Sequence, residues 1–516
     1  MFSSARSGVL SLSLSVVTIS IGCVIGYGQS MAEFRTPTAP AAPRINGPKV
    51  YGARPGHPFL YRIPCTGTRP IRFAASGLPA SLKLDANSGI ISGHTPADAG
   101  ELALTLKASN AHGKTSRPFK IVVGGTIGLT PQMGWNDWYS YYEHPTDKDV
   151  REAAGAMIAS GMADYGYEFV DIDDAWARRP GSADAQLAEP TRDSDGNILP
   201  NDRFPSMGEL TSYIHSLGLK AGIYSGPGPL TCARFEASYQ HEDADARQFS
   251  NWGFDLLKYD WCSYGGIANS KDISELELPY RKMGSILEEQ ARDIILNMCQ
   301  YGKGEVWKWG REVGGMSWRT TGDLGAVKGT TLPGFYSVGF ANATLDAYAG
   351  PGGWNDPDYI LIGTVGDATN ITKPAKPTSL TPGEQYSYMS MWSLMAAPLF
   401  FSGEMTRLDP FTLNVLCNSE VIDIDQDSLG KQGKIIRKSD KEFILAKPLE
   451  DGSIAVGLFN LSTEPLTIAF DFADAGTGGK RKVRDLWRQK DMGVFKGGFE
   501  HEVKAHDVLL VRLNHP

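Results

Sequence analysis

Apolar and polar residues follow three successive patterns along the chain. Residues 49–124 carry short runs in which the two kinds alternate, such as 102–106 (LALTL) and 119–123 (FKIVV), separated by turns that contain Gly and Asn. Alternation with a period of two residues predicts strands that bury one face. Many such strands in so short a region are typical of a β-sandwich.

The pattern changes at residue 125. Up to residue 425, helix-like segments alternate with apolar runs that end in polar residues, such as 168–174 (EFVDIDD), 219–224 (LKAGIY) and 256–260 (LLKYD). About eight such units predict a (β/α)8 TIM barrel, whose active site forms where the strands end. Residues 426–516 return to alternating strands with Gly turns, which predicts a C-terminal antiparallel β-sandwich.

The first 48 residues precede these regions. No charge lies between Arg6 and Glu33, and the intervening stretch is largely apolar, so we expect residues 1–32 to be a signal peptide and the protein to be secreted or periplasmic. An uncleaved membrane anchor, or a lipid on Cys23, is the alternative. Residues 33–48 are rich in Pro and Ala and are expected to be a linker that acts as a spacer. No other segment has the roughly 20 uninterrupted apolar residues of a membrane span.

Composition and charge narrow the class of partner. Hydrophobic residues make up 41% and charged residues 21% of the 516 residues, and the formal net charge is -8. Such a chain is globular and offers no basic surface to nucleic acid or anionic lipid, so a neutral substrate fits better. The cysteines lack the spacing of a metal site, and after Cys23 five remain, for which we expect one or two disulfides and a buried thiol. We expect neither a metal nor an organic cofactor.

Two aspartates end predicted strands of the barrel. Asp260 comes two residues after Lys258, and Asp323 follows Arg319. Cleavage of a sugar acetal needs two carboxylates, one to attack or stabilise the anomeric carbon and one to protonate the leaving oxygen. We expect Lys258 to lower the pKa of Asp260 and keep it ionised as a nucleophile, and Asp323 to stay protonated as the general acid. An ordinary ion pair is the alternative for Arg319 and Asp323.

Other residues at the predicted strand ends suit a sugar. Trp135 follows the first barrel strand, where its ring offers a platform for the apolar face of a sugar, although a buried core position is the alternative. Asp173 and Asp174 follow the second strand and can accept hydrogen bonds from sugar hydroxyls. Together with the two aspartates above, they favour a glycosidase.

These residues belong to a series of motifs that resembles the α-galactosidase or melibiase family, glycoside hydrolase family 27. The motifs follow the family's order: 134–135 (GW), 172–176 (IDDAW), 203–205 (RFP), 222–225 (GIYS), 258–262 (KYDWC), 319–323 (RTTGD), 352–358 (GGWNDPD) and 396–399 (AAPL). The resemblance implies a retaining exo-α-galactosidase that acts on a galactose-containing glycan, with Asp260 as nucleophile and Asp323 as acid/base. It also implies a disulfide between Cys232 and Cys262, and sugar contacts from Trp135, Asp173, Asp174, Tyr224, Lys258, Cys262, Gln300 and Arg319.

The chain departs from the family's pattern in two places. Ala175 stands where many relatives have Cys, so a second family disulfide is missing. Gln300 is followed by Tyr301 where several relatives have Glu-Trp, in a loop near the 2-position of the sugar. The alternatives are therefore an α-N-acetylgalactosaminidase, a β-L-arabinopyranosidase or an enzyme that acts on α-glucan. The short side chains of Asp173 and Asp174 leave room for a 6-hydroxyl and favour galactose.

The N-terminal region has a resemblance of its own. Residues 77–93 resemble the Ig-like modules found beside secreted bacterial enzymes, and we expect a spacer or docking role for this sandwich. A carbohydrate-binding protein built on an inactive barrel is a more distant alternative. Binding alone requires neither Asp260 nor Asp323, so the presence of both argues against it.

Overall fold

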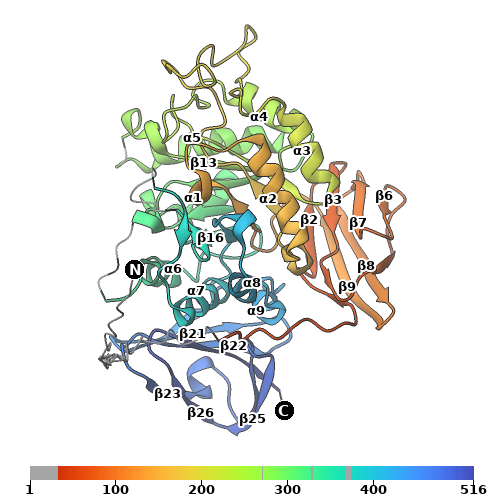
Figure 1. Ribbon diagram of the computed structural model, residues 1–516, viewed down its shortest axis with the longest axis vertical. Coiled ribbons are helices and arrows are strands. Elements are labelled where there is room, and N and C mark those ends of the chain that lie inside the picture. Colours follow the sequence, from red (N-terminus) through yellow and green to blue (C-terminus); the bar gives the residue numbers. More distant parts are fainter. Residues whose placement is uncertain (1–32, 270, 327–328, 330, 367–372, 516) are drawn as a thin grey trace, which may run out of the picture. The chain divides into compact units, whose positions relative to one another are not determined.

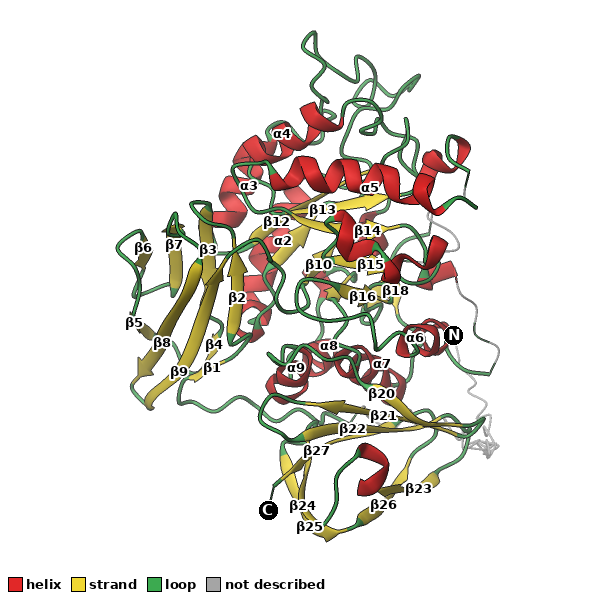
Figure 2. Cartoon of the chain, turned by 180° about the vertical axis from the view of Figure 1, so that it is seen from behind, coloured by secondary structure: helices red, strands yellow, loops and turns green. Residues whose placement is uncertain are grey.

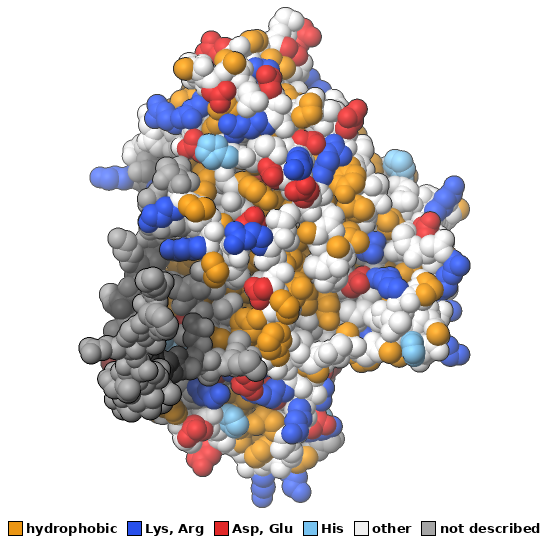
Figure 3. Space-filling view, in the orientation of Figure 1, with side chains coloured by type: hydrophobic (Ala, Val, Ile, Leu, Met, Phe, Trp, Pro, Cys, Tyr) orange, Lys and Arg blue, Asp and Glu red, His pale blue; other side chains and the backbone are white. Residues whose placement is uncertain are grey.

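The computed structural model describes residues 33–515, apart from 270, 327–328, 330 and 367–372. The expected signal peptide, with Cys23, lies outside the described residues. Over the part of the chain that is described, no helix is long and apolar enough to cross a membrane. On the face shown in Figure 3, acidic and basic side chains are interspersed rather than separated into patches of one sign.

Eight parallel strands form the central sheet: the first seven pair with their neighbours in chain order, and the eighth pairs with the first. An isolated parallel bridge between Ile360 and Phe401 joins the segment after the seventh strand to the eighth. Every residue of these strands is buried, as expected for a parallel sheet covered on both faces. The strands are β10 (Met133–Asn136), β11 (Phe169–Asp171), β12 (Lys220–Ser225), β13 (Leu256–Asp260), β14 (Ile295–Cys299), β15 (Ser317–Arg319), β16 (Trp354–Asp356) and β19 (Leu399–Phe401).

Helices alternate with these strands and surround them (Figure 1). Several begin at a side-chain cap: Thr146 accepts from the Asp149 amide, and Thr381 forms a reciprocal capping box with Glu384, which satisfies amides that the helix leaves free. The helices are α1 (Trp138–Tyr141), α2 (Asp147–Ala159), α3 (Met207–Ser216), α4 (Glu242–Trp252), α5 (Ile273–Glu288), α6 (Gly334–Ala343), α7 (Pro382–Leu394), α8 (Pro410–Leu416) and α9 (Ser419–Asp425).

The N-terminal domain is a β-sandwich with its own hydrophobic core, which includes Phe59, Phe73 and Ile121. One sheet has the order β2-β9-β8-β5 and the other β3-β7-β6, and β1 pairs with β4 beside them. The strands are β1 (Arg44–Ile45), β2 (Val50–Ala53), β3 (Pro58–Arg62), β4 (Cys65–Thr66), β5 (Arg72–Ser76), β6 (Leu82–Leu84), β7 (Ile90–His94), β8 (Gly100–Asn110) and β9 (Gly113–Val123).

The C-terminal domain is built from antiparallel strands (Figure 2). A six-stranded sheet of order β20-β21-β22-β27-β24-β25 accompanies the pair β23-β26. Helix α7, buried from Glu384 to Leu394, packs against β21, β22 and β27. The strands are β20 (Lys434–Lys438), β21 (Glu442–Pro448), β22 (Ile454–Asn460), β23 (Leu466–Asp471), β24 (Lys480–Asp485), β25 (Lys490–Lys496), β26 (Gly498–Val503) and β27 (Val508–Asn514). The fold class expected from the sequence is confirmed.

The start of the Pro/Ala-rich segment is not a free spacer. The Arg35 guanidinium is buried and donates to Asp507 of the C-terminal domain at 2.8 Å, and the Arg35 amide donates to the Tyr386 hydroxyl on α7. Asn414 donates to the Thr36 carbonyl at 2.7 Å. The expectation of a simple spacer is therefore wrong here, because composition does not reveal a single buried arginine that anchors the segment.

Candidate active site

The carboxyl ends of the barrel strands bring most of the expected site residues together. Asp260 ends β13 and Arg319 ends β15, while Asp173 and Asp174 directly follow β11. A small cavity of about 50 Å³ lies at this end of the strands. Its lining residues are Trp138, Tyr139, Asp173, Asp174, Tyr224, Cys232, Lys258, Asp260, Tyr301, Arg319, Asp323, Asp358 and Tyr359.

The Asp260 carboxylate is buried and held by two tyrosines. The Tyr301 hydroxyl donates to Oδ1 at 2.6 Å, and the Tyr224 hydroxyl donates to Oδ2 at 3.0 Å. Burial raises the pKa of Asp260, and the Lys258 charge and the Tyr301 hydrogen bond lower it without cancelling that rise. The expectation that Lys258 leaves Asp260 with a lowered pKa is therefore wrong. The cause is that Lys258 donates to Asp173 instead, at 2.7 Å, while burial disfavours the charged carboxylate.

Asp173 is the hub of the polar floor of the cavity. Its Oδ2 accepts hydrogen bonds from the Asn136 amide at 2.8 Å, the Lys258 ammonium at 2.7 Å and the Tyr359 hydroxyl at 3.1 Å. The Lys258 ammonium also lies 5.0 Å from the centre of the Tyr359 ring. This network fixes Asp173 and Lys258 before any ligand arrives.

Asp174 lies beside this hub and has a different environment. Its two oxygens accept from the backbone amides of Ala175 and Ala233, at 2.7 and 2.8 Å, which leaves further lone pairs for a ligand. Burial raises the pKa of Asp174 to about 7, although these hydrogen bonds lower it. Ala175 adopts a φ of 77°, in the left-handed region.

Arg319 joins two carboxylates. Its Nη2 lies 3.2 Å from Asp323 and 2.9 Å from Asp358. The Asp323 side chain is 50% exposed, whereas the side chains of Arg319 and Asp358 are buried. Burial raises the pKa of Asp358 to about 6, against the lowering effect of Arg319. Asp323 therefore pairs with Arg319, as the ion-pair alternative expected, and still faces the cavity that Asp260 lines.

Three expected sugar contacts, Trp135, Gln300 and Cys262, do not line this cavity, although Cys232, which is bonded to Cys262, does. Trp135 is fully buried and donates from Nε1 to the Gly403 carbonyl at 2.8 Å, so it occupies the core position that was the alternative for it. Gln300 is also fully buried, and its amide donates to the Lys303 carbonyl at 2.7 Å. Tyr301, with a φ of 62°, reaches the cavity in its place.

Five lining residues were not predicted from the sequence: Trp138, Tyr139, Tyr301, Asp358 and Tyr359. Asp358 ends the motif 352–358, so its position was visible there, and Tyr359 follows it directly. Tyr301 follows Gln300, but only the structure shows that Tyr301, and not Gln300, lines the cavity. The sequence motif therefore pointed to Asp358, whereas Tyr301 and Tyr359 were indicated only by their position next to predicted or motif residues.

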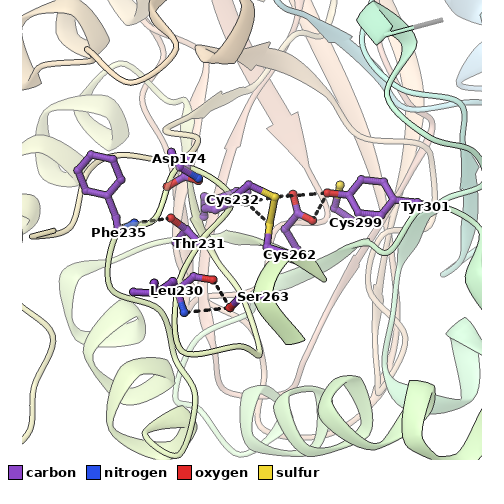
Figure 4. Close-up of a disulfide and its surroundings, with 12 residues drawn as sticks. Asp174, Leu230, Thr231, Cys232, Phe235, Cys262, Ser263, Cys299 and Tyr301 are labelled. Atoms are coloured by element: carbon purple, nitrogen blue, oxygen red, sulfur yellow. Dashed lines mark hydrogen bonds between the residues drawn. A yellow bond between two sulfur atoms is a disulfide. The ribbon is translucent and has the colours of Figure 1, made fainter. Parts of the chain in front are cut away.

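The expected disulfide between Cys232 and Cys262 is confirmed (Figure 4). It links the loop after β12 to the residue two positions after Asp260 and lies close to Tyr301, whose hydroxyl is 3.6 Å from the Cys232 sulfur. The Tyr224 hydroxyl lies 3.2 Å from the Cys262 sulfur. Cys65, Cys299 and Cys417 are free buried thiols, so the described chain has one bridge and three thiols.

Removing this disulfide is expected to destabilise the barrel. The bond closes a loop of 30 residues, and the chain-entropy model gives about 3.6 kcal/mol for such a loop. The double variant Cys232→Ala/Cys262→Ala should therefore unfold at a lower guanidinium concentration than the wild type. A reductant is the matched control: it should lower the wild-type midpoint and leave that of the variant unchanged. Equal midpoints for the two proteins without reductant would contradict this expectation.

Comparisons with known proteins agree on one family. The family model described as alpha galactosidase A matches residues 130–427, the model of the alpha galactosidase C-terminal beta sandwich domain matches 442–513, and an Ig domain model matches 42–124. The chain is 36% identical over 385 residues to an alpha-galactosidase of Cyamopsis tetragonoloba, and the matched region covers 74% of this chain and 85% of that protein. It is 35% identical over 408 residues to an alpha-galactosidase of Oryza sativa, and the matched region covers 78% of this chain and 89% of that protein.

A solved structure extends the likeness beyond the barrel. A crystal structure from Bacteroides fragilis superposes with a TM-score of 0.83 at 34% identity. The match covers 92% of this chain and 98% of that one, so it includes the N-terminal sandwich as well as the barrel and the C-terminal domain.

Proposed function

Because the chain belongs to the alpha-galactosidase family of glycoside hydrolases, we propose that Asp260 and Asp323 are the nucleophile and the acid/base with which it hydrolyses terminal α-galactosyl residues. The observation that carries the proposal is that the two carboxylates line one cavity at the carboxyl ends of the strands. Asp260 is held rigidly by two tyrosines. Asp323 is half exposed, as suits a group that exchanges protons with a leaving group and with water.

The reaction retains the anomeric configuration in two steps. In the first, Asp260 attacks the anomeric carbon while Asp323 gives its proton to the departing oxygen, which leaves a galactosyl ester on Asp260 and releases an alcohol. In the second, Asp323 takes a proton from a water molecule that attacks the same carbon and frees Asp260. Arg319 orients Asp323, and Tyr224 and Tyr301 orient Asp260.

We expect the enzyme to prefer an α-galactoside to an α-N-acetylgalactosaminide and to a β-L-arabinopyranoside. Asp173 and Asp174 can accept bonds from the 4- and 6-hydroxyls, and losing one buried hydroxyl partner costs about 1–3 kcal/mol, or roughly 5- to 150-fold. The arabinoside lacks the 6-hydroxymethyl group. The measurement is kcat/KM on the three p-nitrophenyl glycosides with residues 33–516. A tenfold preference for either competitor would contradict this view of the pocket.

The Tyr301 hydroxyl is expected to set the acid limb of the pH profile. The free enzyme must carry Asp260 ionised, so kcat/KM falls as the pH drops through the pKa of Asp260. Tyr301→Phe removes a hydrogen bond that lowers this pKa, so the limb should move to higher pH, by about one unit for a charge-assisted bond. Tyr213→Phe, on the outer helix α3, is the control and should leave the limb in place. An unmoved limb in Tyr301→Phe would show that the hydrogen bond does not act on Asp260.

We also propose that the protein is exported, with residues 1–32 removed as a signal peptide. The proposed limits are a connecting segment at 33–48, anchored at its start by Arg35 and paired with the sandwich through β1, then the Ig-like sandwich at 49–124, the catalytic barrel at 125–425 and the C-terminal sandwich at 426–516. The support is the uncharged, largely apolar start of the sequence. Mass spectrometry of the exported protein should find an N-terminus near residue 33, whereas an intact or lipid-bearing Cys23 would favour anchoring.

A further inference from the structure

A second cavity, of about 380 Å³, lies between the N-terminal sandwich and the opposite end of the barrel. On the barrel side it is lined by the segment before β10 and by residues at the amino ends of β11 to β14, whereas Asp260 and Asp323 lie at the carboxyl ends. It is much larger than the cavity that contains these two aspartates. Its own carboxylates are already paired with cations, so it is not an alternative catalytic centre.

One wall is the outer face of the sandwich. Leu60 on β3 and Ser92 on β7 are direct cross-strand partners, as are Pro58 and His94, so these four side chains share one face of the sheet and all line the cavity. Tyr51 on β2 adds an aromatic ring to this wall. The barrel contributes apolar side chains opposite, among them Phe169 and Ile295.

The barrel side also provides polar groups of both signs. The Lys220 ammonium lies 2.8 Å from Glu168 and 4.2 Å from the centre of the Tyr51 ring. His215 lies 2.8 Å from Asp255, and His57 of the sandwich lies 2.9 Å from Asp293. Burial raises the pKa of Glu168 to about 8 and lowers that of Lys220 to about 7. The cavity therefore presents donors and acceptors without an excess of one charge.

One further polar group in the wall has no partner. Gln132 is 3% exposed, and neither atom of its side-chain amide has a hydrogen-bond partner among the described residues. A buried polar atom without a partner costs about 1–3 kcal/mol, so native proteins rarely keep one without a purpose. Because Gln132 lies in the wall of the cavity, an occupant that carries both donors and acceptors offers the partners that this amide lacks.

We infer that this cavity binds a neutral saccharide of one or two rings. Its volume lies near the small end of the range for small-molecule sites, which limits the size of the occupant. An anion would face three carboxylates, and a cation would face Lys220 and Arg292. A purely apolar molecule would remove solvent from these charged pairs and would leave the Gln132 amide without a partner. A sugar matches the combination because it presents hydroxyls at its edge and an apolar face to an aromatic wall.

The consequence is that the Ig-like domain and the barrel form a sugar site together. The site would hold glycan at the end of the barrel remote from catalysis, so it would add affinity for a multivalent substrate without taking part in hydrolysis. This inference uses the sugar class of the proposed function but none of the catalytic assignments.

The test is equilibrium dialysis of radiolabelled galactose, glucose and mannose against residues 33–516. Ser92→Trp fills the cavity, and Ser116→Trp, on an exposed position of β9 outside the cavity, is its matched control. We expect at least one of the three sugars to occupy one more binding site per protein molecule in the wild type and in Ser116→Trp than in Ser92→Trp. Both variants should hydrolyse p-nitrophenyl α-galactoside at the wild-type rate. The activity assay therefore tests the proposed catalytic function, and the dialysis tests the second sugar site.

Tyr51→Ala provides a second test that does not add bulk. It removes the aromatic wall and the contact with Lys220, and it should weaken the additional equivalent at least fivefold. If, at concentrations up to tens of millimolar, Ser92→Trp binds as many molecules of each sugar as the wild type does, the cavity holds only water and the inference is overturned.

Discussion

Asp260→Asn is expected to abolish turnover of p-nitrophenyl α-galactoside while leaving the fold intact. The amide has nearly the same shape as the carboxylate. Its oxygen can still accept from one of the two tyrosines, Tyr224 or Tyr301, and its NH2 can donate to the hydroxyl oxygen of the other, but it cannot form the galactosyl ester. Removing a nucleophile from a comparable two-step hydrolase lowers kcat by about 10⁶-fold, so we expect a loss of at least about 10⁴-fold.

The control for this variant is Asp195→Asn, in an exposed loop of the barrel. Its kcat should equal that of the wild type, and both variants should show the wild-type circular dichroism spectrum. A loss of less than tenfold in a well-folded Asp260→Asn protein would exclude Asp260 as the nucleophile.

Asp323→Ala should give a loss that depends on the leaving group. A galactoside with a poor leaving group, such as raffinose, needs a proton on the departing oxygen, and general acid catalysis contributes about 10²- to 10⁴-fold. A 2,4-dinitrophenyl α-galactoside leaves without that proton, so its first step should be nearly unaffected. The second step then becomes slow, because Asp323 no longer activates water.

Azide separates these two steps. It needs no general base, so it should restore turnover of the activated substrate in Asp323→Ala and yield α-galactosyl azide, because it attacks the β-linked ester and inverts it again. If the rates of Asp323→Ala on raffinose and on the dinitrophenyl galactoside fall by the same factor, and azide restores neither, the acid must be another group.

The sequence predicted most accurately the features that depend on local chain order. A residue at the end of an apolar run in a (β/α)8 barrel must lie at the carboxyl end of a strand, and this placed Asp260, Arg319, Asp173 and Asp174 around one cavity. The family resemblance predicted the disulfide, which the structure confirms.

The errors concern side-chain direction and net electrostatics. Gln300 and Tyr301 are neighbours, and the sequence does not show that Tyr301 lines the cavity while Gln300 is buried and donates to the Lys303 carbonyl. Trp135 was assigned to the pocket from its position after a strand, yet it points into the core, where its indole meets Gly403. The pKa of Asp260 depends on burial, which a sequence neighbour such as Lys258 does not reveal.

The sequence also did not predict contacts between segments that are far apart in the chain. The Arg35 anchor and the cavity between the Ig-like domain and the barrel both arise where residues hundreds of positions apart meet. Periodicity describes one element at a time, so it gives no information on which faces of two domains pack together.

The most direct test of the account is to trap the covalent intermediate with 5-fluoro-α-D-galactosyl fluoride. Fluorine next to the ring oxygen destabilises the oxocarbenium-like transition states of both steps, while the fluoride leaving group keeps the first step fast enough for the ester to accumulate. Peptide mass spectrometry of the inactivated enzyme should find one fluorogalactosyl group, attached to Asp260. A group attached to any other carboxylate, or inactivation without a covalent adduct, would contradict the mechanism.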